Sequence, residues 1–182
     1  MINRRKALIC LCGFGLTSLC HNVRAKVNLS SIPIKRHESA MQAAIAMGAQ
    51  NASYPFGAVI TDANSGEILA KGVNQTFRNP VLHGEMVCIN NYIDQRGNKN
   101  WGERILYTTG EPCPMCMSAL VWAGIGGVVF GSSAETIKQS GIDIFVFSAN
   151  DINKGNSFSQ TELLGGILEP ECNALFVNRK RL

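Results

Sequence analysis

Two short motifs constrain the fold of this chain more than any other feature of its sequence. They are His83-Gly84-Glu85 and, 30 residues after the histidine, Cys113-Pro114-Met115-Cys116. Each precedes an apolar stretch with helical spacing, so each is expected where a helix begins. The C-x-x-C spacing puts two sulfurs on one side of a first helical turn, where free N–H groups and the helix dipole favour thiolates. A fold that uses both motifs must bring these two helix starts together.

The side chains of these motifs are typical of a catalytic zinc site. One imidazole and two thiolates give a tetrahedral zinc ion three ligands and leave its fourth position for water, whereas a structural site closes with a fourth protein ligand. We therefore expect His83, Cys113 and Cys116 to bind Zn²⁺. Glu85 reaches the same pocket if His83 occupies the non-helical cap position. A carboxylate there can take a proton from a water that the metal acidifies and pass it to a ring nitrogen and a leaving amine. The order H-x-E…P-C-x-x-C is the signature of the zinc deaminases.

Hydrophobic periodicity predicts an α/β fold. Helices are expected at 38–47, 87–93, 112–122, 134–139 and 171–177, with Pro112 opening the third. Strands are expected at 56–61, 67–73, 104–109, 128–130 and 144–147, and the first two form a hairpin around Asn64-Ser65-Gly66. The stretch 149–166 carries no clear pattern. Strands that alternate with helices indicate a mixed, largely parallel sheet with helices on both faces.

Three segments resemble the cytidine and deoxycytidylate deaminase superfamily: 55–60, 82–85, and 109–116 with Ala119 and 122–124 after it. They are most similar to its free-base and nucleoside branch, which includes guanine deaminase, cytosine deaminase and the tRNA adenosine deaminases. The likeness covers roughly 38–147. It implies a three-layer α/β/α sandwich with a mixed five-stranded sheet, a homodimer, and zinc-dependent hydrolytic release of ammonia.

The resemblance also implies residues that contact the substrate. Asn74 is the candidate for a substrate-reading asparagine late in the second strand. Phe56, Ala58 and Glu111 match motif positions that line the pocket or brace the zinc site. We expect a free base as substrate, with guanine first and cytosine or an adenine-type base next. A tRNA adenosine deaminase is the alternative.

The distribution of charge argues against a nucleic-acid partner. Of 17 basic residues, four lie in the first 25 positions, which hold no acidic residue, so 26–182 carry 13 basic and 13 acidic residues. Proteins that bind RNA or DNA usually present a basic face to the phosphates. The basic tail at 178–182 is interpreted as solvated.

The N-terminus has the order of an export signal. Arg4-Arg5-Lys6 is followed by an apolar run at 7–19 and by Val23-Arg24-Ala25, a small-residue cleavage pattern. The run is too short to span a bilayer as a helix. The sequence thus predicts a signal peptide at 1–25, a deaminase domain at 26–182 and a periplasmic or secreted location, or a cytoplasmic one if the segment is not cleaved.

Other interpretations of the cysteines remain open. An exported chain with C-x-x-C at a strand-to-helix junction could be a thiol-disulfide oxidoreductase. A structural zinc site would take Cys88 or Cys172 as its fourth ligand, although Cys88 is most simply a small buried residue. Two further residues are expected to be structural, with His37 solvated or capping before a helix and Trp122 in the core.

Overall fold

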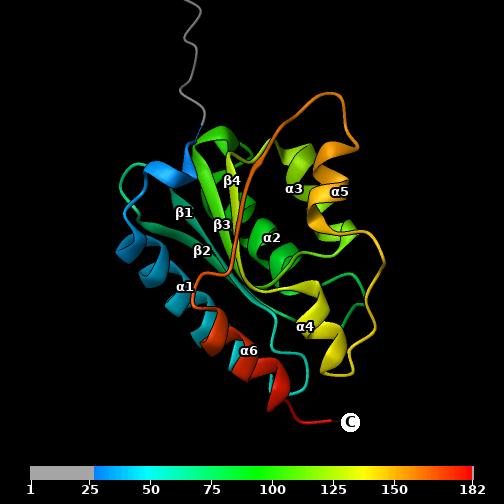
Figure 1. Cartoon of the computed structure of the whole chain (residues 1–182). Coiled ribbons are helices and arrows are strands. Elements are labelled where there is room, and N and C mark those ends of the chain that lie inside the picture. Colours follow the sequence, from blue (N-terminus) through cyan, green and yellow to red (C-terminus); the bar gives the residue numbers. More distant parts are fainter. Residues whose placement is uncertain (1–26, 182) are drawn as a thin grey trace, which may run out of the picture.

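The computed structural model describes residues 27–181, which form a three-layer α/β/α sandwich (Figure 1). The sheet has five strands in the order β2-β1-β3-β4-β5. These are β1 (Gly57–Asp62), β2 (Ile68–Val73), β3 (Arg104–Gly110), β4 (Gly127–Ser132) and β5 (Glu162–Gly165). β1 pairs antiparallel with β2 and β3, with Val59 opposite Tyr107, while β3, β4 and β5 are parallel. The expected mixed five-stranded sheet is confirmed.

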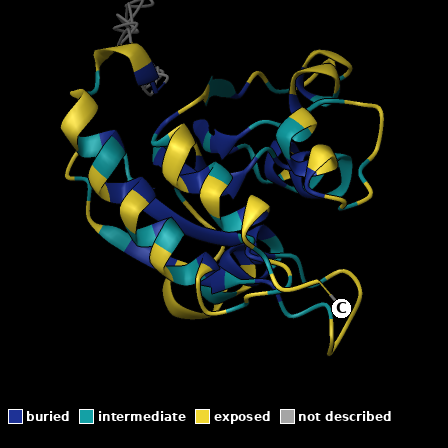
Figure 2. Cartoon of the chain, turned by 60° about the horizontal axis from the view of Figure 1, so that its bottom comes forward, coloured by how far each residue is buried: buried dark blue, intermediate teal, exposed yellow. Residues whose placement is uncertain are grey.

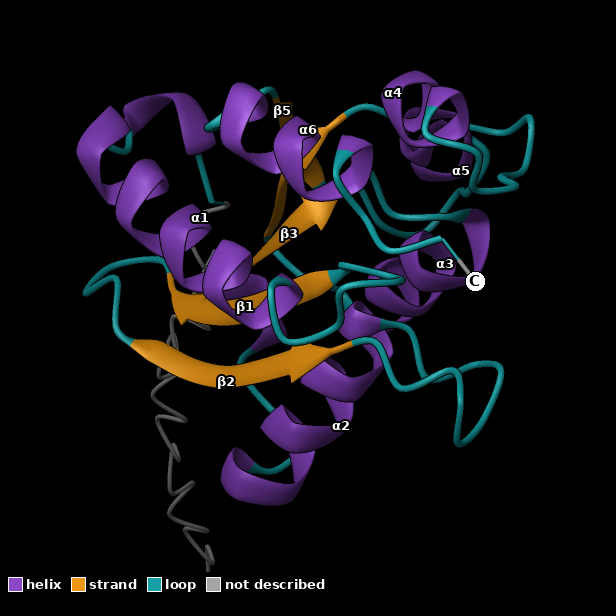
Figure 3. Ribbon diagram, turned by 90° about the horizontal axis from the view of Figure 1, so that it is seen from below, coloured by secondary structure: helices purple, strands orange, loops and turns teal. Residues whose placement is uncertain are grey.

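Helices cover both faces of the sheet (Figures 1 and 3). One face carries α1 (Ile34–Gly48) and α6 (Glu169–Val177), and the other carries α2 (Gly84–Arg96), α3 (Pro114–Ala123) and α5 (Ala149–Lys154). The short α4 (Ala134–Gln139) follows β4 and packs against α6. Two 3₁₀ turns, Leu29–Ser31 and Trp101–Glu103, complete the described elements. None of these helices is both long enough and apolar enough to cross a lipid bilayer.

Alternate residues of the central strands fill two separate cores. In β3, Leu106 points into the core beneath α2 and α3, while Ile105 and Tyr107 point into the core beneath α1. Successive side chains of a strand face opposite sides of the sheet, so a strand covered on both faces is apolar throughout. Figure 2 shows the result, with buried residues concentrated in the sheet and on the inner sides of the helices.

Two predictions about local structure are wrong. The run 144–147 is a loop, and the fifth strand is β5 within the unassigned stretch. Phe145, Val146 and Phe147 are 67%, 91% and 59% exposed, because β5 already pairs with the free side of β4 and leaves this run no place in the sheet. Helix α3 begins at Pro114, with Cys113 as its N-cap, so Pro112 lies before it.

His37 and Trp122 also differ from expectation. His37 is buried within α1, where its ring contacts the Tyr107 hydroxyl and the Leu29 carbonyl, both at 3.0 Å. Its partners come from other elements, so its place in the sequence gave no sign of them. Trp122 is 76% exposed on α3 and packs on Phe158, with ring centroids 4.6 Å apart. The predicted signal peptide, 1–25, lies outside the described residues.

Glycines allow α2 to approach the sheet closely. A Cβ placed on Gly72 of β2 would overlap the carbonyl oxygen of Gly84 and the amide nitrogen of Cys88, both in α2. A Cβ on Gly84 would overlap the carbonyl oxygen of Phe56. The first turn of α2 therefore rests directly on the backbone of the sheet. Any larger residue at Gly72 must push the start of α2 outward.

This contact predicts a specific loss of stability. Gly72→Ala should lower the free energy of unfolding by about 1–3 kcal/mol, the usual range for overpacking in a well-packed region. Gly102→Ala is the control, since a Cβ at Gly102 meets nothing within 4 Å, and it should change stability by less than about 0.5 kcal/mol. Urea denaturation followed by circular dichroism measures both. Equal effects of the two substitutions would contradict the close approach.

Candidate active site

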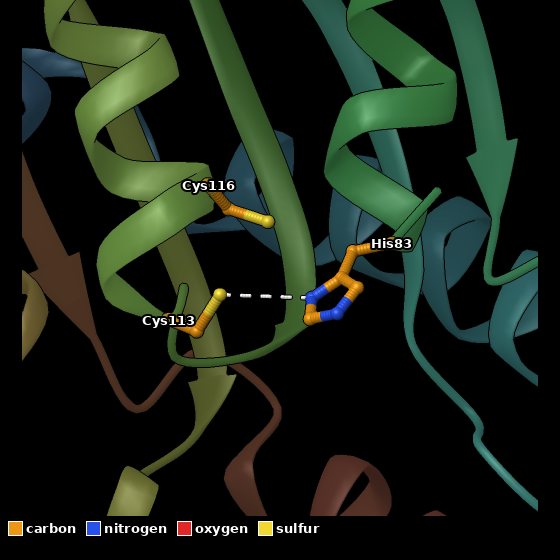
Figure 4. A group of neighbouring side chains, drawn as sticks. All are labelled: His83, Cys113 and Cys116. Carbon is orange, nitrogen blue, oxygen red and sulfur yellow. Dashed lines mark hydrogen bonds between the residues drawn. The ribbon is translucent and has the colours of Figure 1, made fainter. Parts of the chain in front are cut away.

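Three candidate metal ligands meet where α2 and α3 begin. His83 is the N-cap of α2, Cys113 is the N-cap of α3 and Cys116 lies in the first turn of α3. The histidine Nδ1 is 3.6 Å from the Cys113 sulfur, and one ligand atom from each residue lies within 4.8 Å of the others (Figure 4). His83 has extended backbone angles, φ −63° and ψ 161°, so it occupies the expected non-helical cap position.

The electrostatics of the cluster favour a thiolate at Cys113. The contact with the Cys116 side chain lowers the pKa of Cys113 to about 4, and the same contact raises the pKa of Cys116. The hydrogen bond with Cys113 also raises the pKa of His83. A thiolate therefore forms readily here, and thiolate is the form that binds a metal. Two sulfurs and one imidazole nitrogen are ligands that suit zinc, so the residues fit the expected ion.

A fourth protein ligand is absent from this cluster among the described residues. Cys88 is buried in the core beneath α2, and Cys172 is buried in the core beneath α1, across the sheet. Burial raises the pKa of Cys88, and it raises that of Cys172 to about 12. The structure therefore favours a three-residue site over the closed structural site considered as an alternative.

Glu85 lies beside the three ligands without being one of them. It is the second residue of α2 and only 2% exposed. Its carboxylate accepts a hydrogen bond from the Thr108 hydroxyl at 3.4 Å and one from the Cys116 thiol at 3.6 Å. Burial raises the pKa of this carboxyl. The arrangement holds a proton-accepting group next to the metal position.

A cavity of about 310 Å³ opens over this cluster. It lies at the carboxyl ends of β2, β3 and β4, the usual position of ligands in open α/β sheets. His83, Glu85 and Cys113 contribute to its lining, Phe56, Asn74 and Thr76 line one side, and the segment 142–148 supplies further lining residues. Of the residues that the structure describes around this cavity, none is Lys or Arg.

Three of the four predicted substrate-contact residues line the cavity. Asn74, directly after β2, accepts hydrogen bonds through Oδ1 from the backbone and hydroxyl of Thr76. Phe56 packs against Phe176, with ring centroids 5.0 Å apart. Ala58 does not line the cavity, because it is fully buried in β1.

Glu111, the third predicted residue that lines the cavity, also connects two helices beside it. Its carboxylate accepts hydrogen bonds from the backbone N–H groups of Ala134 and Ala149, both at 3.0 Å. These are the first residues of α4 and α5. Glu111 therefore joins the starts of two helices that flank the segment 142–148.

Sequence reasoning missed that segment as part of the site. Asp143 stands among Ile142, Ile144, Phe145 and Phe147, and all five residues line the cavity. The run looks like a buried strand because periodicity cannot distinguish a short apolar strand from an apolar loop. Asp143, directly before the predicted strand 144–147, was the available signal. A charged group next to a buried strand is costly to bury, so its presence favours a loop at a functional site.

Comparison with known proteins identifies the family. The model described as the cytidine and deoxycytidylate deaminase zinc-binding region matches residues 34–132. Guanine deaminase of Bacillus subtilis (strain 168) is 32% identical over 113 residues, which cover 59% of this chain and 71% of that protein, and its structure aligns with a TM-score of 0.54. The tRNA-specific adenosine deaminase of the same strain is 32% identical over 123 residues, which cover 66% of this chain and 72% of that protein.

A more distant structure supports the fold. The protein NE0047, solved in complex with 2,6-diaminopurine, is 22% identical to this chain, with a TM-score of 0.70. The alignment covers 78% of this chain and 81% of that one.

The relatives contradict one prediction. The periplasmic or secreted location inferred from 1–25 is wrong, since the relatives include tRNA-specific adenosine deaminases and tRNA is a molecule of the cell interior. A basic and apolar N-terminus is a compositional pattern that does not by itself prove export. Cleavage after position 25 concerns residues outside the described part and stays a prediction.

The zinc ligands and the family match agree on the same residues. The matched region, 34–132, contains His83, Glu85, Cys113 and Cys116. Such a match favours a deaminase over a C-x-x-C oxidoreductase, which requires neither the histidine nor the glutamate. The chain belongs to the cytidine and deoxycytidylate deaminase family, whose members bind zinc.

Proposed function

We propose that this protein is a zinc-dependent hydrolytic deaminase of a free nucleobase, with guanine as the first substrate to test. The observation that carries the proposal is the buried Glu85 carboxyl beside three metal ligands, at the base of a cavity with no basic lining residue among those described. In the reaction, water adds to the ring carbon that bears the amino group, the C–N bond breaks, and ammonia and a ring carbonyl result.

His83, Cys113 and Cys116 would hold the zinc ion, which supplies Lewis acidity and lowers the pKa of water. Glu85 is the general acid and base. Its carboxylate takes a proton from the attacking water and delivers it to a ring nitrogen. It then takes the remaining hydroxyl proton of the adduct and passes it to the amine, which leaves as ammonia while the ring carbonyl forms. Burial raises the pKa of Glu85, which helps the group to hold a proton between these steps. The Thr108 hydroxyl orients the carboxylate by donating a hydrogen bond to it.

The chemistry of the cavity supports a small, uncharged substrate. A volume of about 310 Å³ is at the lower end of the range for ligand pockets. A phosphate usually requires a basic partner, whereas Asp143 on the cavity wall is an acceptor for N–H groups. Guanine offers such donors along the edge that carries its amino group. The similarity to a guanine deaminase supports the same choice.

A tRNA adenosine deaminase is the second candidate. The observation in its favour is the relative of that name, which is as similar as the guanine deaminase, at 32% identity. The balanced charge of 26–182 and the cavity lining speak against a polynucleotide.

The homodimer implied by the family resemblance also stays a proposal. Trp122, Phe147 and Phe158 line an apolar groove on the surface of the monomer, and all three are largely exposed. Aromatic residues are enriched in protein interfaces. A second copy of the chain is the partner that we expect there.

The role of Glu85 predicts a variant that keeps its metal. Glu85→Gln should retain about one zinc ion per chain, because the glutamate lies outside the ligand set. Its turnover should fall by about 100-fold or more, within the usual contribution of a general acid and base. Metal analysis and an ammonia-release assay check the two parts. Loss of zinc from this variant would show that Glu85 is a ligand.

The cysteines should separate into two classes. Cys113→Ser and Cys116→Ser should lose both zinc and activity, whereas Cys88→Ser, a buried cysteine outside the cluster, should keep both. Zinc content per chain and turnover are measured for all three variants. A fully metallated but inactive Cys116→Ser protein is the result that the three-ligand site cannot accommodate.

Salt dependence distinguishes the two substrate classes. For a free base, kcat/KM should change little between about 50 and 200 mM salt, whereas binding of several phosphates would weaken by orders of magnitude. Guanine, cytosine and adenosine are assayed beside a tRNA anticodon stem-loop. Salt-sensitive turnover of the stem-loop, with none of any base or nucleoside, would overturn the free-base proposal in favour of the RNA candidate.

A further inference from the structure

One wall of the cavity is a loop that is fastened at both ends. We call the segment 141–148 the pocket loop; it connects α4 to α5 and has no helical or strand structure. Asp143 and Phe145 of this loop line the cavity. Without a hydrogen-bonded ladder of its own, the loop depends on contacts at its ends for a fixed position.

Arg179, in the basic tail after α6, fastens the first end. Its guanidinium donates to the carbonyl oxygens of Gly141 at 2.9 Å and of Ser140 at 3.4 Å. A third hydrogen bond, 3.3 Å long, goes to the Ser53 carbonyl, and the Tyr54 ring centroid is 5.9 Å from the guanidinium carbon. Tyr54 itself lines the cavity. One side chain thus joins the start of the pocket loop to another segment of the cavity rim.

The expected solvated tail is therefore wrong for this residue. Arg179 is half-buried, whereas Lys180 and Arg181 are exposed. The backbone N–H of Lys180 donates to the Ala52 carbonyl at 2.8 Å and holds the tail against the same rim. A guanidinium is suited to this position because its planar fork serves several acceptors at once, which a lysine ammonium on a flexible stem does not match.

Glu111 fastens the second end. Its carboxylate accepts the backbone N–H of Ala149, directly after the pocket loop, and that of Ala134 at the start of α4. The two anchors come from opposite parts of the chain, one just before the zinc ligands and one at the C-terminus. Between them the loop has fixed ends, and these end contacts set the position of Asp143.

We propose that Arg179 is a positioning residue for substrate binding. It fixes the start of the pocket loop against the rim formed by Ser53 and Tyr54, and thereby places Asp143 and Phe145 in the cavity. It has no part in holding the metal or moving the proton. Its loss therefore raises KM and leaves zinc content unchanged. The substrate part of this inference rests on the proposed function, whereas the fastening of the loop does not.

Limited proteolysis tests the fastening without any substrate. Chymotrypsin should cleave Arg179→Ala after Phe145 about ten-fold faster than the wild type, while cleavage after the exposed Phe77 stays constant. Arg181→Ala removes the same charge from an exposed position and should behave as the wild type. Arg179→Lys should resemble Arg179→Ala, since it lacks the fork. Unchanged cleavage at the pocket loop in Arg179→Ala would overturn the proposal.

Kinetics test the consequence for the substrate. On whichever base the wild type deaminates, Arg179→Ala should raise KM by about ten-fold or more, with kcat within about three-fold and zinc content unchanged, which is the pattern of lost binding. Faster loop cleavage with an unchanged KM would overturn the positioning role. A wild type that deaminates no base would instead refute the proposed function, and proteolysis would still decide whether Arg179 holds the loop.

Discussion

The close contact between the first turn of α2 and the sheet determines where the site can form. Gly72 and Gly84 leave room for backbone to meet backbone, so the N-cap of α2 stands at the edge of the sheet where β3 ends. The chain then leaves β3 and enters α3 after three intervening residues, which puts a second helix start beside the first. Two N-termini at one edge concentrate free N–H groups and dipole ends there, and this favours thiolates and a buried carboxylate.

This arrangement separates the residues of the metal cluster from the residues that shape the outer cavity. Those nearest the sheet are the three candidate metal ligands and Glu85, and they are positioned by helix caps and by Thr108 of β3. The pocket loop lies farther from the sheet and shapes the cavity, and side chains from distant segments, Glu111 and Arg179, hold its ends by hydrogen bonds. The first group belongs to the region that the family match covers, whereas Asp143 and Arg179 lie beyond its last residue, 132. The pocket loop and the Arg179 side chain that fastens it therefore lie in the part of the chain that the family pattern does not describe.

The residues of the metal cluster could be predicted from the sequence, whereas most of the outer cavity could not. The ligands and Glu85 were predictable because each follows from a short motif at a helix start, where local spacing fixes geometry. The pocket loop was not, since an apolar run has the same pattern in a strand and in a loop over a cavity. Strand β5 escaped notice because its four residues sit at the sheet edge with little burial. His37 and Arg179 depend on partners far along the chain, 70 residues away at Tyr107 and 126 at Ser53. Ala58 was assigned by motif position alone, and its place inside β1 turns the side chain into the core.

We infer that this fold holds a zinc ion with three protein ligands and leaves one position for water. X-ray absorption at the zinc edge of the purified full-length protein tests it most directly. A three-ligand site should give about two sulfurs near 2.3 Å and about two lighter atoms, one imidazole nitrogen and one oxygen, near 2.0–2.1 Å. A zinc ion bound by three or four sulfurs would contradict it, since such a shell would recruit Cys88 or Cys172 and close the site to water.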